Sequence, residues 1–171
     1  MDEVLRGRRV TLRPLAAQDM AARAKWTADP ELARLMAAST GPAASQTNPE
    51  EEVRRNLEWL ERRRKCGAMP YAVEVDGRYI GDIDYGLRPQ AGKADLTVFL
   101  GDRWEWGKGY GAEAAELVIC EMFRDERIRS VEVDVAACND RAFRFWNKMG
   151  FRLVSVDDKG ARLMIRFRAV S

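Results

Sequence analysis

A glycine-rich run at positions 106–114 constrains the fold of this chain more than any other feature of the sequence. It joins a turn directly to the start of a helix and reads Trp106-Gly107-Lys108-Gly109-Tyr110-Gly111-Ala112-Glu113-Ala114. Three alternating glycines let backbone N–H groups turn toward one point, which the free N–H groups and the positive dipole end of the helix also face. The run therefore predicts a site for an anion, such as the phosphates of a bound molecule.

The periodicity of apolar residues along the chain, together with its turn and helix-cap residues, predicts a mixed α/β fold. Strands are expected at about residues 9–13, 71–75, 78–85, 94–100, 131–135, 151–156 and 162–167. Helices are expected at about 19–26, 48–66, 110–124 and 139–149, with a short additional helix that begins at 29–31. Asp76-Gly77 suits a two-residue hairpin turn, and the strand, helix and strand of residues 94–135 form a βαβ unit. We expect a mostly antiparallel twisted sheet of about seven strands, with one parallel crossover and flanking helices.

Composition excludes several classes of protein. The 171 residues are enough for one compact domain, which we place at residues 1–171. Lys and Arg number 29 against 27 Asp and Glu, so the formal charge of +2 gives no basis for a nucleic-acid partner. No apolar run approaches membrane-spanning length, and we expect a cytoplasmic protein with no membrane partner.

The side chains available for chemistry are restricted. The chain has no histidine, which removes Ser-His-Asp and Cys-His nucleophile systems and histidine-based metal sites. Its three cysteines are odd in number and widely spaced, which argues against disulfides and zinc, and we expect no metal. Catalysis would have to use carboxylates, tyrosines, backbone groups or water.

Several short motifs occur in a characteristic order. They are Thr11-Leu12-Arg13-Pro14-Leu15, the helix start Asp29-Pro30, Gly81 after the hairpin, the run 106–114, and Asn139 followed by Ala142 and Lys148-Met149-Gly150-Phe151. Together they resemble the GNAT superfamily of acyl-CoA-dependent N-acetyltransferases, in particular the branch that includes ribosomal-protein N-terminal (alanine or serine) acetyltransferases. The resemblance runs nearly end to end and implies a GNAT-type fold, with acetyl-CoA as co-substrate and an amine as acceptor.

The resemblance also implies which residues hold the coenzyme. Its pyrophosphate would lie on the turn, and its pantetheine arm along the free backbone of a splayed strand, where the thioester carbonyl would be polarised. Asn139 would steady the same arm, and one face of its helix would lie against the coenzyme. The cofactor-binding residues implied in this way are Val98, Phe99, Leu100, Trp106, Gly107, Lys108, Gly109, Tyr110, Gly111, Asn139, Phe143 and Trp146.

Two positions bear on proton transfer. Asp95 occupies a place where the family often has a carboxylate, so we interpret Asp95 as the general base, with Asn139 as the second catalytic residue. Asp82 and Asp84 share one strand face and could attract a cationic substrate, although such alternation is also typical of a solvated face. Many members have a tyrosine acid where this chain has Trp146, and an indole cannot protonate the leaving thiolate.

The sequence is compatible with three hypotheses of function. The acceptor could be a protein N-terminal α-amine, or a small amine such as an aminoglycoside or a polyamine. A non-catalytic acyl-CoA-binding or sensing module is the third hypothesis, which Trp146 and the absence of histidine favour. The loop at residues 39–47 could gate acceptor entry, and the last two strands could pair across a homodimer.

Overall fold

A computed structural model describes residues 3–36 and 48–169 of the chain. The 39–47 segment, predicted to be a loop near the acceptor, lies outside the described residues. The elements follow in the order β1 (Leu5–Arg6), β2 (Thr11–Pro14), η1 (Ala17–Asp19), α1 (Met20–Thr27), α2 (Pro30–Met36), α3 (Pro49–Lys65), β3 (Met69–Val75), β4 (Arg78–Arg88), η2 (Pro89–Ala91), β5 (Lys93–Leu100), η3 (Arg103–Glu105), α4 (Tyr110–Met122), β6 (Ser130–Val135), α5 (Asp140–Lys148), β7 (Arg152–Val156) and β8 (Arg162–Phe167).

Local sequence signals account for most of these boundaries. The Asn48 side chain accepts a hydrogen bond from Glu51 N at the start of α3, and Asn139 accepts one from Ala142 N at the start of α5. Asp29 Oδ1 accepts from the N–H groups of Glu31 and Leu32 in α2. The predicted helices and strands are confirmed to within a few residues.

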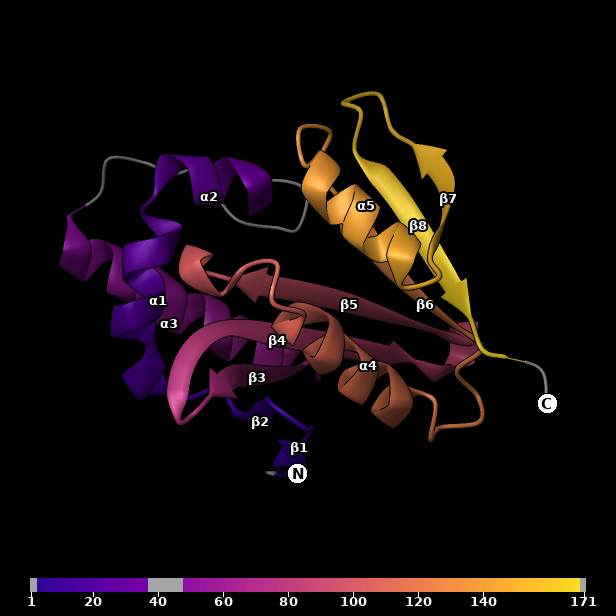
Figure 1. The fold of residues 1–171 in the computed structure, drawn as a ribbon, viewed down its shortest axis with the longest axis horizontal. Helices are drawn as coiled ribbons and strands as arrows, with labels where there is room; N and C mark the ends of the chain where they lie inside the picture. Colours follow the sequence, from indigo (N-terminus) through magenta and orange to yellow (C-terminus); the bar gives the residue numbers. More distant parts are fainter. Residues whose placement is uncertain (1–2, 37–47, 170–171) are drawn as a thin grey trace.

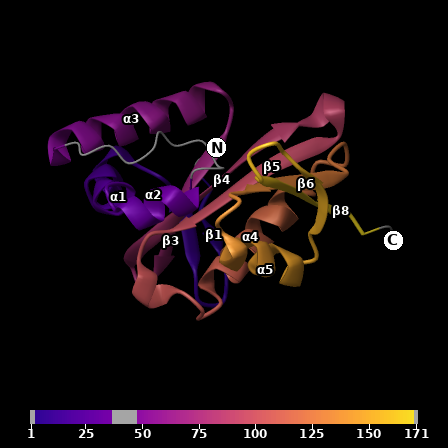
Figure 2. The same cartoon turned by 90° about the horizontal axis from the view of Figure 1, so that it is seen from above.

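The strands form one sheet in the order β1-β2-β3-β4-β5-β6-β8-β7 (Figure 1). Every neighbouring pair is antiparallel except β5 and β6, which confirms the predicted single parallel crossover. Figure 2 shows α1 and α3 on one side of the sheet and α4 with α5 on the other. The described sheet has eight strands rather than about seven, because the two residues of β1 are too few to show a period of two in sequence.

The main core lies between the sheet and the two later helices. Ala114, Ala115, Val118, Ile119 and Met122 of α4 are buried against apolar side chains of β3, β4, β5 and β6. A second, smaller cluster joins the other face of the sheet to α1 and α3 through Leu15, Met20, Leu60 and Ala72. Each face of the sheet therefore has its own apolar layer.

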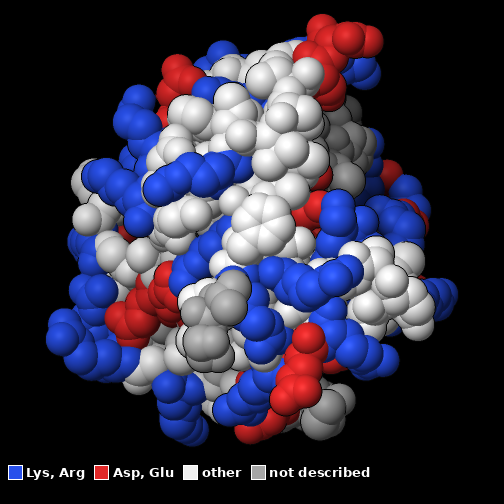
Figure 3. Space-filling model, turned by 90° about the vertical axis from the view of Figure 1, so that its right-hand side faces the viewer, with Lys and Arg blue, Asp and Glu red and all other residues white. Residues whose placement is uncertain are grey.

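β7 is an edge strand, and all five of its residues are exposed. Leu153, Val154 and Val156 are among the exposed large apolar side chains. Figure 3 views the molecule from the side on which β7 lies in Figure 1 and shows uncharged surface among basic and acidic side chains. An uncovered edge strand is a template for pairing, and its pairing with a second copy in a homodimer stays a prediction.

Gly81 allows β4 to approach β5 closely beside the site. A Cβ atom at this position would lie 2.2 Å from the carbonyl oxygen of Phe99 and 2.7 Å from Leu100 Cα. Because both atoms belong to the backbone, the Gly81→Ala substitution must push β4 and β5 apart. We expect it to lower the free energy of unfolding by about 3 kcal/mol and Tm by roughly 6–12 °C. Calorimetry tests this, and an unchanged Tm would contradict the close approach.

Candidate active site

The parallel strands β5 and β6 separate after three residue pairs. Pairing runs from Lys93 with Ser130 to Asp95 with Glu132, whereas β5 continues alongside β4 as far as Leu100. In the described part of the chain, residues 97–100 therefore have a strand neighbour on the β4 side and none on the β6 side, as predicted for a splayed strand. A gap of this kind gives ligands access to the interior of a sheet.

One of the three backbone positions predicted to be free is occupied. The Leu100 carbonyl accepts a 2.7 Å hydrogen bond from the Trp106 indole Nε1. The expectation for Leu100 is corrected accordingly, because this carbonyl is already satisfied by a side chain of the glycine-rich run. Trp106 thereby ties the turn to the end of β5.

A cavity of about 460 Å³ opens between β5, the glycine turn and α5. Ten of the twelve residues predicted to bind the coenzyme line it: Val98, Phe99, Leu100, Trp106, Gly107, Gly109, Tyr110, Gly111, Asn139 and Trp146. The sequence prediction missed three basic residues of α5 that also line the cavity, Arg141, Arg144 and Lys148. Their spacing of three and four residues places them along one helix face, and this spacing was visible in the sequence.

The glycine turn presents unpaired donors to this cavity. Gly107 and Gly109 have φ angles of 79° and 87°, and Gly109 is the N-cap of α4. The first intrahelical bond is donated by Glu113 N, and no described side chain caps the helix. The N–H groups of Tyr110, Gly111 and Ala112 therefore precede the helical ladder, and they lie where the helix dipole favours an anion.

Lys108 and Phe143 are oriented differently from what was predicted. Lys108 Nζ lies 3.0 Å from Glu105 Oε2, and the residue does not line the described cavity. Phe143 packs beneath the guanidinium of Arg162, whose Cζ lies 4.6 Å from the ring centroid, while Phe145 lines the cavity instead. The cations at this cavity are thus on α5 rather than in the turn.

Asn139 and Trp146 both have structural partners. Asn139 Nδ2 donates to the Leu35 carbonyl at 3.1 Å, and its Oδ1 caps α5, so both ends of the amide are used. The Trp146 ring is buried and lies edge-on to Phe145 and Phe151 at 4.7 and 4.9 Å. The catalytic role assigned to Asn139 stays a prediction, and Trp146 supplies no acid.

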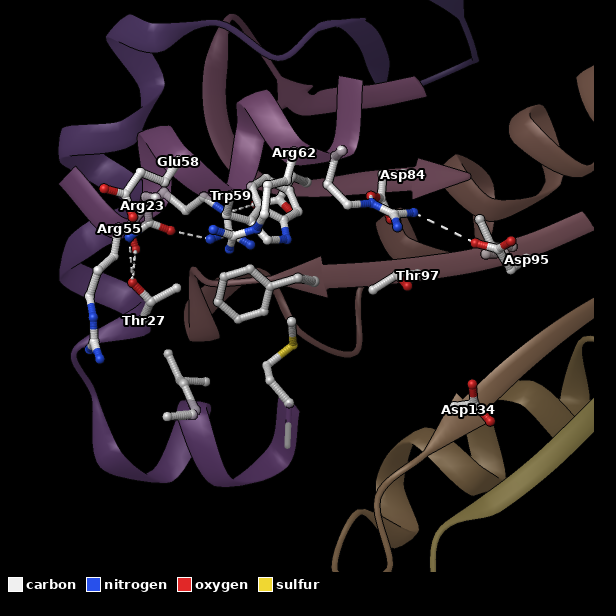
Figure 4. A pocket seen from close by; sticks show the side chains of 18 of the residues that line it. Arg23, Thr27, Arg55, Glu58, Trp59, Arg62, Asp84, Asp95, Thr97 and Asp134 are labelled. Carbon is white, nitrogen blue, oxygen red and sulfur yellow. Dashed lines mark hydrogen bonds and ion pairs between the residues drawn. The ribbon is translucent and has the colours of Figure 1, made fainter. Parts of the chain in front are cut away.

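A second cavity of about 480 Å³ lies on the side of the sheet that α1 and α3 cover (Figure 4). It shares Leu32, Met36 and Phe99 with the first cavity. The two cavities therefore meet at these three apolar side chains, which we call the collar. Strand register explains its charge, since Asp84 pairs with Thr97, Asp82 with Phe99, and Asp95 with Glu132. Paired residues point to the same face of a sheet, so these carboxylates converge.

Asp84 is the carboxylate whose protonation is most altered. It is 3% exposed and forms an ion pair with Arg63 Nε. Burial raises the pKa of Asp84 to about 6, with Arg63 opposing the shift and Asp82 and Asp95 adding to it. A carboxylate with that pKa is ionised at neutral pH and basic enough to accept a proton.

Asp82 and Asp95 have different surroundings. Asp82 receives hydrogen bonds from Arg23 Nε at 2.9 Å and Tyr79 OH at 3.1 Å, and is buried. Asp95 has a half-exposed side chain 3.6 Å from Arg63 Nη2 and 3.5 Å from Arg88 Nε. The predicted base Asp95 therefore does line the cavity, next to the more deeply buried Asp84.

The family model described as an acetyltransferase (GNAT) domain matches residues 9–152. The chain belongs to the GNAT acetyltransferase family. A relative from Bacillus licheniformis, named uncharacterized N-acetyltransferase p20, is 24% identical over 151 residues, which are 88% of this chain and 83% of the relative.

Solved structures show the same GNAT fold. RimL, a ribosomal L7/L12 α-N-protein acetyltransferase in complex with coenzyme A, superposes with a TM-score of 0.78 at 14% identity, covering 96% of this chain and 98% of RimL. The aminoglycoside acetyltransferase AAC(6')-Ib, in complex with ribostamycin and coenzyme A, gives 0.74 at 20% identity, with 94% of each chain covered. These likenesses confirm the predicted fold class.

The two cavities of this GNAT domain offer different chemical groups. The first offers N–H donors and cations, which suit a phosphorylated molecule, and the second offers carboxylates, which suit an amine, together with arginines. Among the described residues, no group of His, Cys, Asp or Glu is arranged to hold a metal ion. The same residues include no helix with the length and apolarity needed to cross a bilayer.

Proposed function

We propose that the protein transfers an acetyl group from acetyl-CoA to the primary α-amine of an acceptor, by direct attack in a ternary complex. The observation that carries this proposal is the meeting of an anion-binding cavity and a carboxylate-lined cavity at Leu32, Met36 and Phe99. A thioester and an amine placed in the two cavities would meet at that collar. Holding both reactants together in this way lowers the barrier without a covalent enzyme intermediate.

Acetyl-CoA is the donor that suits the first cavity. Its diphosphate would accept hydrogen bonds from the turn and from the first turn of α4, while Arg141, Arg144 and Lys148 would attract its phosphate charge. The free backbone at Val98 and Phe99 lies where the pantetheine arm and thioester would extend toward the collar. Membership of the GNAT family supports the same donor.

Asp84 is the group that we propose as base. An acceptor ammonium gives one proton to the Asp84 carboxylate, and the neutral amine attacks the thioester carbon. As the C–S bond breaks, the nitrogen gives up a further proton, which water carries to the departing coenzyme thiolate, so that the products are the amide and the free thiol. Transfer of a proton to a base of pKa about 6 costs roughly 3 kcal/mol from an α-ammonium of pKa about 8, and roughly 6 kcal/mol from a lysine of pKa about 10.4. This difference favours an α-amine over a lysine side chain.

The leaving group needs little help. A thiol of pKa about 8.5 is released as its anion at neutral pH at a cost of roughly 2 kcal/mol, so water can supply the proton that Trp146 cannot. The absence of an acid at position 146 is therefore compatible with catalysis.

Release of free thiol tests the function directly. The protein is incubated with acetyl-CoA and either a peptide with a free N-terminus, the same peptide blocked at its N-terminus but carrying a lysine, spermidine, or an aminoglycoside. We expect thiol release that requires the amine and is fastest with the free N-terminus. Binding of acetyl-CoA without release in any of these reactions would favour the non-catalytic binding module, and equal rates for the lysine and the N-terminus would contradict α-amine preference.

A further inference from the structure

The second cavity, to which we assign the acceptor and which we call the acceptor cavity, has two walls of opposite charge. The helix wall, from α1 and α3, contributes four arginines and two glutamates: Arg23, Arg55, Arg62, Arg63, Glu52 and Glu58. The strand wall, from β4, β5 and β6, contributes five carboxylates and one arginine: Asp82, Asp84, Asp95, Glu132, Asp134 and Arg88. A polycation would find half of this cavity repulsive, whereas a molecule with separated positive and negative groups matches both walls.

Most guanidinium groups in the cavity already have a carboxylate partner. Arg23 pairs with Asp82 at 2.9 Å, Arg63 binds Asp84, Arg88 lies 3.1 Å from Glu132, and Arg55 lies 3.6 Å from Glu52. Their charge is therefore largely balanced within the protein. These pairs fix the shape of the site but leave little attraction for a ligand anion.

Arg62 differs from these four arginines. Within residues 3–36 and 48–169, its side chain has no ion pair or hydrogen bond, and this exposed side chain extends from α3 and lines the cavity (Figure 4). It directly precedes Arg63, the partner of Asp84, so the two side chains begin about 3.8 Å apart along the backbone. A guanidinium without a partner among the described residues thus lines the same cavity as the carboxylate that we propose as base.

We infer that the acceptor is an amine that carries its own carboxylate, with the carboxylate bound by Arg62 and the amine directed to Asp84. This inference rests on the proposed acetyl transfer and names its substrate class. A guanidinium binds a carboxylate through two parallel hydrogen bonds, which fixes orientation as well as position. The same chemistry occurs in a free amino acid and in a peptide that begins with acidic residues, and the strand wall would hold the ammonium group of either.

Matched acceptors and variants test the inference. The acceptors are two C-terminally amidated tetrapeptides that differ only in Glu or Gln at positions 2 and 3, free glutamate, and spermidine. We expect kcat/KM to be highest for a carboxylate-bearing acceptor, and the comparison of acidic peptide with glutamate identifies its source. Arg62→Met should lower kcat/KM for that acceptor about tenfold and leave the Gln peptide nearly unchanged.

Lys65→Met is the matched control. Lys65 lies on the same helix, is ion-paired with Glu61 and does not line the described cavity, so its loss should not change the preference. The inference is overturned if spermidine or the Gln peptide is the best acceptor, or if Arg62→Met slows all acceptors equally. Failure of the proposed function looks different, because no acceptor would then release thiol even from unmodified protein.

Discussion

Asp84→Asn should lower kcat for an α-amine acceptor by about 100-fold or more while leaving acetyl-CoA binding unchanged. An amide cannot accept the proton that the ammonium must lose, and general-base catalysis is worth roughly 10²–10⁴-fold. Asp84 lines the acceptor cavity and not the described coenzyme cavity, which is why the two measurements should separate. Steady-state rates with saturating acetyl-CoA, together with calorimetric titration of the coenzyme, provide the test.

Asp95→Asn is the matched substitution that decides between the two carboxylates. Asp95 is half exposed between Arg63 and Arg88, and the same change there should cost much less if Asp84 is the base. The reverse ranking would assign the base to Asp95, as the sequence alone predicted. Equal and small effects would show that neither carboxylate accepts the proton.

The pH dependence of activity tests independently whether Asp84 is the base. The pKa of Asp84 is raised to about 6, so activity should rise with pH through that value as the carboxylate loses its proton. A second rise near the α-amine pKa of about 8 belongs to the acceptor. Asp84→Asn should remove the lower step and keep the upper one, whereas a purely structural role of Asp84 would move neither.

As the pH rises and Asp84 loses its proton, the free energy of unfolding should decrease while the activity increases. Because the pKa is about 6 in the fold and 3.8 for an ordinary aspartate, ionised Asp84 lowers the free energy of unfolding at neutral pH by about 3 kcal/mol. This penalty is absent below pH 3.8, where the group is protonated in both states, and is complete above pH 6. Asp84→Asn should therefore not lower Tm at pH 8, and a large decrease would show that its ion pair with Arg63 outweighs burial.

The sequence predicted those parts of the site whose geometry depends only on residues that are close together in the chain. The turn and helix start at Gly107 to Gly111 were predictable because they depend only on backbone conformation within a few residues, and anion binding there stays a prediction. The splay of β5 from β6 was implied by family resemblance and appears in the register after Asp95. Neither feature depends on how distant side chains orient.

Side-chain orientation was not predictable in the same way. Lys108 is directed to Glu105, which also accepts a hydrogen bond from Arg78, 27 positions before Glu105 in the chain. The deep burial of Asp84 arises because α3 covers β4, and a period-two pattern of carboxylates does not distinguish a covered face from a solvated one. Such contacts between distant elements decide which carboxylate has an altered pKa, and local sequence patterns do not contain them.

Gly109→Ala should weaken acetyl-CoA binding by roughly 10–100-fold, the cost of losing one hydrogen bond to a charged group. Gly109 has φ of 87°, a conformation that a residue with a Cβ atom adopts only at a cost of about 1–2 kcal/mol. The new Cβ would also lie 3.0 Å from Arg9 Nη2, and the same guanidinium holds the Lys108 carbonyl through Nη1 at 2.9 Å. Rotation of the turn away from this strain would misdirect the N–H groups at the start of α4.

Gly77→Ala is the matched control, because it introduces the same kind of backbone strain outside the glycine turn. Gly77 has φ of 73° in the hairpin turn between β3 and β4, and apart from its chain neighbours no described residue has an atom within 4 Å of an added Cβ. It does not line the described coenzyme cavity. Both substitutions should lower Tm by a similar few degrees, because both force an alanine into the left-handed region. Calorimetric titration should then show weaker acetyl-CoA binding for Gly109→Ala alone. Equal affinities in the two variants would mean that the main-chain amides of the turn do not bind the diphosphate, and the assignment of the donor site would fail with them.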